Sequence, residues 1–506
     1  MKVLKYLPFG ALAAGLAALV LAYLQHKINL LLFFNSDALY LPSLYQDIVQ
    51  RGGRLSQWFL TPAPYFFPDW PLYFAANGLF AQAWHAVAAY FVFQAVLLCG
   101  ALYLLGRLLA PGAVASTSAA AVTLFIALLG AQGAYPYVYL LLSAYHVGEF
   151  LLSLLSLALL VQALRKDGPL PPTLPAGLFA AATLAVMSDK LYVLHHVLAV
   201  LAAFVLMRRR WQPVRRNLLV LAGALLAGCV AGALLHKLLV ANPVGLPWKF
   251  TVKELARNAR DIAALWGGLW QFSPLAATVT LGWYAALLAL LPGTLRGRGW
   301  RIEERGTALL AVSSLASFGG LLLVMLLSRA PVTIRYFIPV FWLPLALAMP
   351  MLHAALPERA RRALLPLAWL ALLAALWQLV SLARGEPRAV QGAPYPEEVA
   401  CIDRALRPYG AVHGIAGYWE ASRITMLSQS GIRVAPVTAT LEPNRWITTG
   451  RNFQSAYDFA LVPRDAAAAD QPEEAALRRL NGEPAAQAEC GMLRVLVYPR
   501  AALKLP

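Results

Sequence analysis

The sequence predicts a polytopic α-helical membrane protein that carries a small α/β domain after its last membrane span. Hydrophobic residues make up 60% of the 506 residues and charged residues only 13%, whereas soluble domains average roughly 25% charged residues. Apolar runs close to twenty residues long recur along the chain, and a run of that length crosses a bilayer as a helix. The polar content becomes ordinary from about residue 384, so we expect a membrane module over 1–383 and a separate domain over 384–506.

About eleven segments are predicted to span the membrane, and the charges between them predict their orientation. Lys and Arg gather in alternate connectors, among them 208–216, 296–305 and 359–362, which the positive-inside rule assigns to the cytoplasm together with the N-terminus. The first span follows Lys2 and Lys5 without an evident cleavage site and is expected to be a retained signal anchor. The odd number of spans places the C-terminal domain on the periplasmic, or extracytoplasmic, side of a cell (inner) membrane. The predicted spans are residues 7–34, 85–106, 117–133, 138–163, 174–188, 191–207, 217–239, 274–294, 307–328, 336–352 and 363–383.

The net charge of +18 is explained by these connectors and does not indicate nucleic acid. The sequence shows no patch in which basic and aromatic residues alternate in the manner of a nucleic-acid-binding surface. In the outer connection 240–273, the basic residues Lys249, Lys253, Arg257 and Arg260 are expected to meet anionic lipid headgroups. Membrane lipids are therefore predicted partners, and nucleic acid is not.

Two outer connections are long enough to hold structure of their own. The first, residues 35–84, has apolar residues at helical spacing over 41–49, followed by Gly52-Gly53, which predicts a short interfacial helix that ends at glycine. Asp47 is expected on the solvated face of this helix. The second, residues 240–273, predicts another interfacial helix between its prolines, with Trp266 and Trp270 at the level of the lipid headgroups.

The C-terminal segment alternates short β-like runs with helical patterns, which predicts an α/β domain. It contains two cysteines, Cys401 and Cys490, which can pair if that side of the membrane is oxidising. Sequence alone leaves the pairing open, because it does not place the two Cα atoms within bonding distance. The β-like runs are Val412–Ile415, Phe459–Val462 and Leu493–Tyr498, and the helical patterns are Glu397–Leu406 and Ala475–Leu480.

Several short motifs carry a resemblance to a known family. They are Ser36-Asp37-Ala38-Leu39 with Gly52-Gly53, more loosely Pro68-Asp69-Trp70-Pro71-Leu72, and Arg335-Tyr336 at the start of the tenth span. Together with the two large outer loops and the soluble tail, they resemble the GT-C superfamily of integral-membrane glycosyltransferases, which includes protein O-mannosyltransferases, aminoarabinose transferases of lipid A and oligosaccharyltransferases.

The resemblance implies that an acid of the first outer loop takes part in catalysis and that the donor is a polyprenyl-phosphate-linked sugar. It also implies that transfer takes place on the non-cytoplasmic face. Many members carry paired acids in the first loop and another acid in the next outer loop along the chain, which here is the short turn 133–137 and contains no acid. This departure leaves open whether a divalent metal is used and where a second carboxylate comes from.

Transfer of a sugar from a phosphate carrier to a hydroxyl requires a base for the acceptor and positive charge for the departing phosphate. Asp37 is the first candidate for the base, and its structural alternative is a helix N-cap. Arg335, beside Tyr336, is a candidate phosphate clamp because guanidinium binds phosphate through two hydrogen bonds. Its alternative is an interfacial arginine that extends to the headgroups.

Asp189 and Lys190 form a tight turn between two apolar spans, where two charges are costly unless they pair or face a polar cavity. A site role and a local ion pair that caps the helical hairpin both remain open. His146 and Glu149 are three residues apart on the fourth predicted span, which places them on one face of a helix. They are candidates for substrate binding, for a hydrogen-bonded structural pair, or for a metal site that also includes an aspartate.

Three further residues are weaker candidates. His195 and His196 lie one turn into the sixth predicted span. One of the two can reach a phosphate while the other faces elsewhere, and His196 is taken as the one that reaches it. Asp69, between Pro68 and Trp70, is a candidate for the acceptor path, with a role in a turn as its alternative.

The sequence therefore predicts an inverting glycosyltransferase that uses a polyprenyl-phosphate sugar and a glycan, lipid or protein acceptor on the outer face. A transporter or flippase of a lipid-linked substrate is the alternative, although no internal repeat of the transporter kind is evident and the polar candidates gather at the outer ends of spans. A third interpretation is a non-catalytic scaffold whose tail binds a partner.

Overall fold

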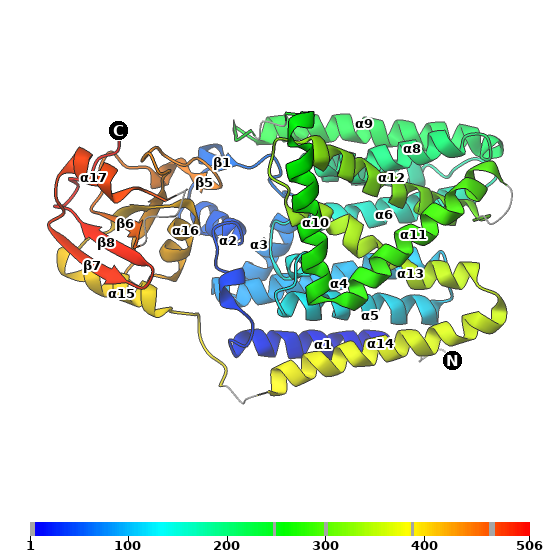
Figure 1. The fold of residues 1–506 in the computed structure, drawn as a ribbon, viewed down its shortest axis with the longest axis horizontal. Helices are drawn as coiled ribbons and strands as arrows, with labels where there is room; N and C mark the ends of the chain where they lie inside the picture. The colour runs from blue at the N-terminus through cyan, green and yellow to red at the C-terminus, as the bar shows by residue number, and fades with distance from the viewer. Residues whose placement is uncertain (1–5, 246–248, 298–301, 386–388, 465–470) are drawn as a thin grey trace.

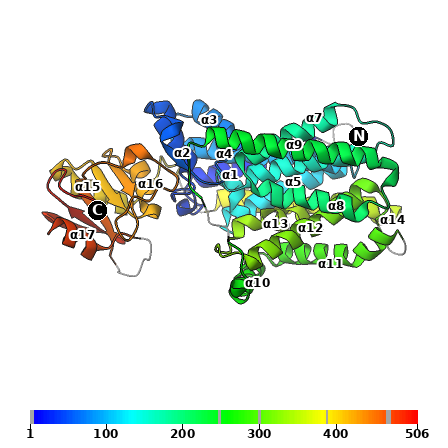
Figure 2. The same cartoon turned by 90° about the horizontal axis from the view of Figure 1, so that it is seen from above.

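The computed structural model describes residues 6–245, 249–297, 302–385, 389–464 and 471–506. The molecule is elongated, with a helical bundle at one end and the C-terminal domain at the other (Figure 1). The same separation is evident from above (Figure 2). The predicted fold class, a mostly helical membrane protein with a C-terminal sheet domain, is confirmed.

Nine helices in the described part of the chain are long and apolar enough to cross a membrane. Two shorter apolar helices correspond to the predicted spans 174–188 and 191–207: α7 (Thr173–Ser188) and a π turn (Val193–Val197) continued by α8 (Leu198–Met207). The nine long helices are α1 (Leu7–Leu24), α4 (Ala83–Arg107), α5 (Gly112–Ala131), α6 (Val147–Leu164), α9 (Arg215–Leu239), α11 (Pro274–Arg296), α12 (Arg305–Leu327), α13 (Ile338–Ala355) and α14 (Glu358–Arg384).

Two of the predicted spans are wrong at one end. The first ends at Leu24 and not at residue 34, because His26 has a φ of 54°, which a continuing α-helix cannot include. The fourth begins at Val147 and not at residue 138, because Ala144 and His146 also have positive φ values, 63° and 67°. The stretch before it, a 3-10 helix (Tyr137–Leu141) and a loop, is buried, and the side-chain amide of Gln94 on α4 donates hydrogen bonds to three of its carbonyl groups, those of Tyr139, Leu140 and Leu142. Such backbone is tolerated at membrane depth only where protein groups satisfy it.

The first outer connection is folded against the C-terminal domain and differs from the prediction at Asp47. Its helix is short, α2 (Tyr40–Tyr45) followed by a π turn (Gln46–Gln50), and it ends as predicted at glycine, with Gly52 at a φ of +65°. Asp47 does not face solvent: it is 6% exposed, it accepts a hydrogen bond from Trp58 Nε1 (2.8 Å), and Arg451 of the tail lies 3.2 Å away. The tail covers the face that the sequence pattern assigned to water.

The second outer connection contains the predicted amphipathic helix, α10 (Leu255–Phe272). It runs across the direction of the bundle helices in Figure 1, as an interfacial helix does. Its buried Asn258 donates through its side-chain amide to the carbonyl groups of Met325, Leu326 and Ser328, which fixes it to the end of α12.

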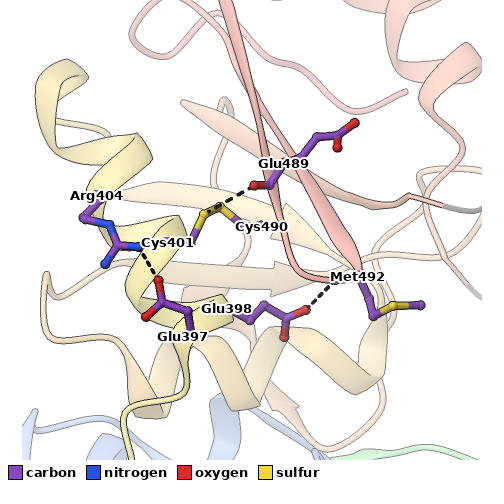
Figure 3. The surroundings of a disulfide bond; sticks show 7 residues. All are labelled: Glu397, Glu398, Cys401, Arg404, Glu489, Cys490 and Met492. Atoms are coloured by element: carbon purple, nitrogen blue, oxygen red, sulfur yellow. Dashed lines mark hydrogen bonds and ion pairs between the residues drawn. A yellow bond between two sulfur atoms is a disulfide. The ribbon is translucent and has the colours of Figure 1, made fainter.

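The C-terminal domain is a five-stranded sheet with helices packed against it. The strand order is β4-β3-β6-β8-β7, with β3 parallel to both β4 and β6, and β8 antiparallel to both β6 and β7. A disulfide bond between Cys401 of α15 and Cys490 of β7 joins a helix to the edge of the sheet (Figure 3). The elements are α15 (Glu397–Leu406), β3 (His413–Ala416), α16 (Tyr418–Leu427), β4 (Arg433–Pro436), β6 (Phe459–Pro463), α17 (Glu474–Asn481), β7 (Ala486–Cys490) and β8 (Leu493–Val497).

A second, three-stranded sheet joins the tail to both outer connections. Its central strand is β1 (Trp58–Leu60) of the first connection, which pairs with β2 (Asn242–Pro243) of the second and with β5 (Thr448–Thr449) of the tail. Three segments that are far apart in sequence are thus held together at the end of the bundle, and a cavity lies beside them.

Candidate functional site

A cavity of about 540 Å³ lies where the two outer connections, the turn after α7 and a loop of the tail meet. The tail contributes Trp446 and Ile447 to its wall, and much of the remaining wall is apolar. Six of the nine predicted site residues line the cavity: Asp37, His146, Asp189, Lys190, Arg335 and Tyr336. The fold therefore brings together residues that come from four separate regions of the sequence.

Asp37 lies on the cavity wall with both carboxylate oxygens engaged. Arg335 Nη1 donates to Oδ2 (3.1 Å), and Tyr418 Oη of the tail donates to Oδ1 (2.5 Å). The Asp37 side chain is 13% exposed and that of Arg335 is 27% exposed. Burial raises the pKa of Tyr418, with the nearby Asp37 carboxylate as a second cause, so this phenol stays protonated and remains a donor.

The Asp37 side chain is not used to cap the helix that follows it. In the turn that carries it, Asn35 supplies the capping interactions: its Oδ1 accepts from the Ala38 N–H (2.9 Å), and its Nδ2 donates to the Leu32 carbonyl (2.9 Å). The following helix α2 begins at Tyr40, and its N-cap residue is Leu39. Asp37 is therefore not the helix cap that its structural alternative required.

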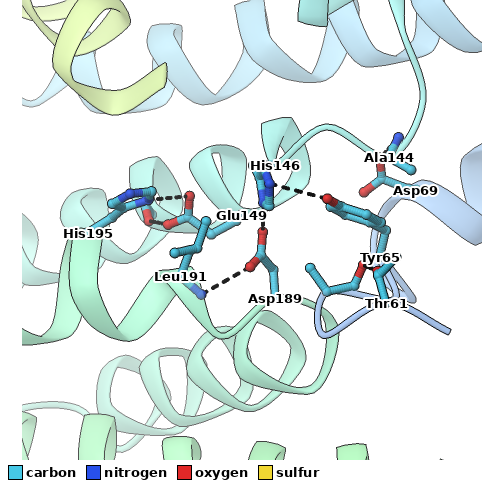
Figure 4. A network of polar contacts seen from close by, with 11 residues as sticks. Thr61, Tyr65, Asp69, Ala144, His146, Glu149, Asp189, Leu191 and His195 are labelled. Carbon is cyan, nitrogen blue, oxygen red and sulfur yellow. Dashed lines mark hydrogen bonds and ion pairs between the residues drawn. The ribbon is translucent and has the colours of Figure 1, made fainter. Parts of the chain in front are cut away.

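His146 and Asp189 form a second polar unit on the wall (Figure 4). His146 Nδ1 lies 2.5 Å from Asp189 Oδ2, and His146 Nε2 lies 3.3 Å from the hydroxyl of Tyr65. The other oxygen of Asp189 accepts a hydrogen bond from the Leu191 N–H (3.0 Å). Of the two alternatives for Asp189, the described contacts show a pair with His146 in place of a local ion pair with Lys190.

Two hydrogen bonds between the first outer connection and Ser188, at the end of α7, hold Tyr65 in place. The Tyr65 N–H donates to the Ser188 carbonyl (3.0 Å), and the Phe67 N–H donates to Ser188 Oγ (2.8 Å). Tyr65 and His146 both have positive φ, 58° and 67°. Conformations of this kind in non-glycine residues cost roughly 1–3 kcal/mol each and cluster at functional sites.

Lys190 and Tyr336 complete the polar wall. Partial burial lowers the pKa of Lys190. The Tyr336 ring lies 5.4 Å from the ring of His146, and the Arg335 guanidinium lies 5.9 Å from the centre of the Tyr336 ring. The cationic residues Lys190 and Arg335 therefore border the cavity from the turn after α7 and from the segment before α13, with His146 among the groups between these two segments.

Three predicted site residues do not line the cavity. Glu149 was expected to share a face with His146, but His146 is the non-helical N-cap of α6, and Glu149 pairs with His195 inside the bundle (Oε2 to Nδ1, 3.1 Å). His196 is also buried, beside the ring of Tyr192 at 4.9 Å. It borders a space of about 20 Å³ between helices and does not line the 540 Å³ cavity, so it is not placed beside Lys190 and Arg335.

Asp69 is buried behind the cavity wall and does not line an acceptor path there. It accepts hydrogen bonds from Tyr90 Oη (2.7 Å) and from the Ala144 N–H (3.1 Å). Burial raises its pKa to about 6. Because Ala144 lies two residues before His146, Asp69 holds the loop that positions His146.

The sequence analysis missed several residues that contribute to the site. Tyr65 lies within the stretch that carries the family motifs, but nothing in its spacing distinguishes it from neighbouring aromatics. Tyr418 and Trp446 come from the tail, more than 380 residues after Asp37, and no local pattern connects them to it. His236 of α9 also lines the cavity, with Nδ1 3.1 Å from the Met187 carbonyl oxygen.

Among the residues that the structure describes, no group of three or more His, Cys, Asp or Glu side chains is arranged to hold a metal ion. Asp37 and the His146–Asp189 pair contribute to the same cavity as separate units, each with its own protein partners.

No protein-family model matches this chain, and no curated protein matches it. Two solved structures of the Archaeoglobus fulgidus oligosaccharyltransferase are similar to it at 14% identity. One is tethered to an acceptor peptide with the NVT sequon and covers 91% of this chain and 69% of its own (TM-score 0.46); the other is a complex with Zn and sulfate and covers 89% and 68% (TM-score 0.45). With TM-scores below 0.5 this likeness carries no argument, and the function of the chain has to follow from its own cavity.

Proposed function

We propose that this chain is an inverting membrane glycosyltransferase of the GT-C type, which moves a sugar from a polyprenyl-phosphate carrier to an acceptor hydroxyl on the outer face of a cell membrane. The observation that carries the proposal is the Asp37–Arg335 pair, a carboxylate and a guanidinium 3.1 Å apart on the wall of a 540 Å³ cavity. The reaction requires a base for the acceptor and a cation for the phosphate. This pair supplies both.

The pairing suggests how the donor prepares the base. A phosphate that enters the cavity competes with Asp37 for Arg335, because guanidinium binds phosphate through two charge-assisted hydrogen bonds. Once Arg335 turns to the phosphate, Asp37 Oδ2 is free, while Tyr418 still holds Oδ1. The resting ion pair thus keeps the base occupied until the donor is bound.

The transfer step then follows from the positions of these groups. Asp37 accepts the proton of the acceptor hydroxyl, and the hydroxyl oxygen attacks the anomeric carbon from the side opposite the phosphate. The bond from that carbon to the phosphate oxygen breaks, and its electron pair leaves with the phosphate. Arg335 and Lys190 stabilise the negative charge that develops there, and the configuration at the anomeric carbon is inverted.

The remaining wall fits a lipid carrier and an acceptor that approaches from the tail. Apolar residues such as Leu194, Phe250 and Val324 border the cavity on the membrane side and suit an isoprenoid chain. Trp446 and Ile447 border it from the tail and are positioned to contact the acceptor, which can be a glycan, a lipid or a protein. Membrane lipids surround the bundle, and the exposed Arg257 and Arg260 of α10 are placed to meet anionic headgroups.

Glycosyl transfer by purified full-length protein tests the proposal, with a panel of polyprenyl-phosphate sugars and with glycan, lipid and peptide acceptors. Asp37→Asn is expected to lower kcat by about 10²–10⁴, the usual contribution of a general base, while donor binding persists. Asp261→Asn, which removes an exposed carboxylate from α10, is the matched control and is expected to keep full activity. Parallel reactions with added divalent metal and with chelator determine whether a metal is required.

The outcomes separate the candidate functions. Full turnover by Asp37→Asn would overturn the assignment of the base. Donor binding without transfer, combined with movement of the carrier across proteoliposome membranes, would favour a flippase. Failure of the wild-type protein to bind any polyprenyl phosphate would overturn the carrier class itself.

A further inference from the structure

His146 is a buried histidine whose two ring nitrogens both have protein partners. Its Nδ1 meets Asp189, which is itself fixed by the Leu191 N–H, and the two side chains are only 5% and 3% exposed. A buried carboxylate on Nδ1 sets the tautomer and the orientation of an imidazole and stabilises its protonated form. The opposite nitrogen, Nε2, is directed to the Tyr65 hydroxyl at the cavity wall (Figure 4).

Ionisable groups surround His146 on several elements. Asp189 and Lys190 face it from the turn after α7, and Arg335 and Tyr336 from the segment before α13. Tyr65 comes from the first outer connection. Asp69 lies behind the loop that carries His146, Glu149 on the same helix is turned into the bundle, Asp37 lies beyond Arg335, and His236 lines the cavity from α9.

We propose that His146 is a second catalytic residue of this site, a general acid that gives the proton on Nε2 to a phosphate oxygen of the departing polyprenyl phosphate, with Asp189 as its positioning residue. This assignment rests on the proposed function. It follows from the place of the ring, which shares its wall with the cations Arg335 and Lys190 that are assigned to the phosphate.

The complete step takes up and releases equal numbers of protons. Asp37 takes one proton from the acceptor hydroxyl, and the imidazolium of His146 gives one proton to the phosphate as the bond from carbon to oxygen breaks. The carrier leaves as a phosphate monoester with one proton, and His146 is left neutral. Asp37 then releases its proton to solvent, and His146 takes one up, so no oxidant, reductant or further reactant is needed.

Ligand binding tests this role without the need for transfer activity. Farnesyl phosphate is a short polyprenyl phosphate, and farnesyl sulfate carries an anion that does not titrate near neutral pH, so its binding reports only on protein protonation. Binding of farnesyl sulfate to the wild-type protein is expected to tighten about tenfold from about pH 8 to about pH 5.5, where imidazoles become charged. His146→Gln is expected to lose this dependence.

Two further variants keep the test decisive. Asp189→Asn preserves the shape of the side chain but removes the carboxylate that holds the ring through Nδ1, so binding of farnesyl sulfate at about pH 5.5 is expected to weaken. His236→Gln is the matched control, since it removes a histidine on the same cavity whose ring nitrogen meets a carbonyl oxygen and not a carboxylate. It is expected to keep the pH dependence of the wild type.

The outcomes distinguish this inference from the proposed function. If the wild type binds neither farnesyl ligand, both fail. If it binds them and His146→Gln retains the full pH dependence, the role of His146 is overturned and the proposed function stands. With an active donor in hand, His146→Gln is also expected to lower kcat by about 10- to 100-fold and to abolish the fall in rate at alkaline pH, a signature that a purely structural histidine would not produce.

Discussion

Two acid–histidine pairs join the same two segments of this protein, and only one of them reaches the large cavity. The N-terminal end of α6 contributes His146 and Glu149, while the segment after α7 contributes Asp189 and His195. The first pair lines a cavity of about 540 Å³, whereas His195 of the second borders a space of only about 20 Å³. Each pair joins a carboxylate to an imidazole, so the two pairs differ in their access to a cavity more than in their chemistry.

Removing one partner of the inner pair is expected to have the largest effect on stability. Glu149→Leu leaves His195 without its carboxylate and removes the acceptor of the Ser153 hydroxyl. Breaking a buried pair of this kind costs about 3–5 kcal/mol. Unfolding of the purified protein by SDS in mixed micelles, followed by tryptophan fluorescence, measures the change in the free energy of unfolding.

The double variant Glu149→Leu/His195→Leu is the control for that loss. Replacement of both members of a buried pair by apolar side chains is often neutral, so the double variant is expected to recover most of the stability. A double variant as unstable as the single one would show that the loss comes from altered packing and not from an unpaired histidine.

Asp69 differs from the acids of the two pairs because it is a buried acid whose partners are neutral donors, Tyr90 Oη and the Ala144 N–H. Burial raises its pKa to about 6 from an ordinary value of 3.8. The folded protein therefore binds this proton more tightly than the unfolded chain, so the contribution of Asp69 to stability increases as the pH falls from about 6 toward 4. A difference of about two pKa units corresponds to roughly 3 kcal/mol.

Asp69→Asn is expected to abolish this pH dependence, because an amide does not titrate and its oxygen can still accept from both donors. The measured quantity is the difference in the free energy of unfolding between variant and wild type at about pH 7.5 and about pH 4.5. Relative to the wild type, the variant is expected to be more stable at the higher pH than at the lower pH. A difference that does not change with pH would mean that Asp69 is not titrating in this range.

The sequence predicts the membrane architecture well because hydrophobic length is a local property. The alternation of apolar runs and basic connectors, the glycine stop at Gly52 and the amphipathic α10 all follow from residues close together in the chain. The errors at the ends of the first and fourth spans have one cause. His26, Ala144 and His146 adopt positive φ, a backbone state that is unusual for these residue types and is imposed by tertiary contacts.

The candidate site could be predicted only in part, for the same reason. Asp37, Asp189 and Arg335 stand out because charge at the end of an apolar run is costly and invites an explanation. Their partners do not stand out: the pairing of Asp37 with Tyr418, or of Asp47 with Arg451, depends on how the tail docks. The expectation that Glu149 shares a face with His146 fails because α6 begins only at Val147, a boundary that hydrophobic periodicity did not locate.

The smallest effect on stability is expected for the ion pair between Arg451 of the tail and Asp47, in which the arginine is exposed. Arg451 is 39% exposed and its nitrogen lies 3.2 Å from the carboxylate. Exposed ion pairs contribute about 0.2–1 kcal/mol. Because Asp47 keeps its hydrogen bond from Trp58 when Arg451 is removed, Arg451→Ala is expected to lower the free energy of unfolding by no more than about 1 kcal/mol. Because salt at about 1 M screens charges beyond roughly 3 Å, the difference from wild type should vanish there, whereas the loss in Glu149→Leu should persist.

Arg445→Ala is the matched control for this last variant. It removes the same charge from the other side of β5, where Arg445 lies over the ring of Phe59 at 5.4 Å. Its effect is expected to be similar in size and less dependent on salt. A loss above about 2 kcal/mol in Arg451→Ala that persists in salt would contradict this ranking of the variants. It would mean that burial of Asp47 alone determines how much the pair contributes to stability.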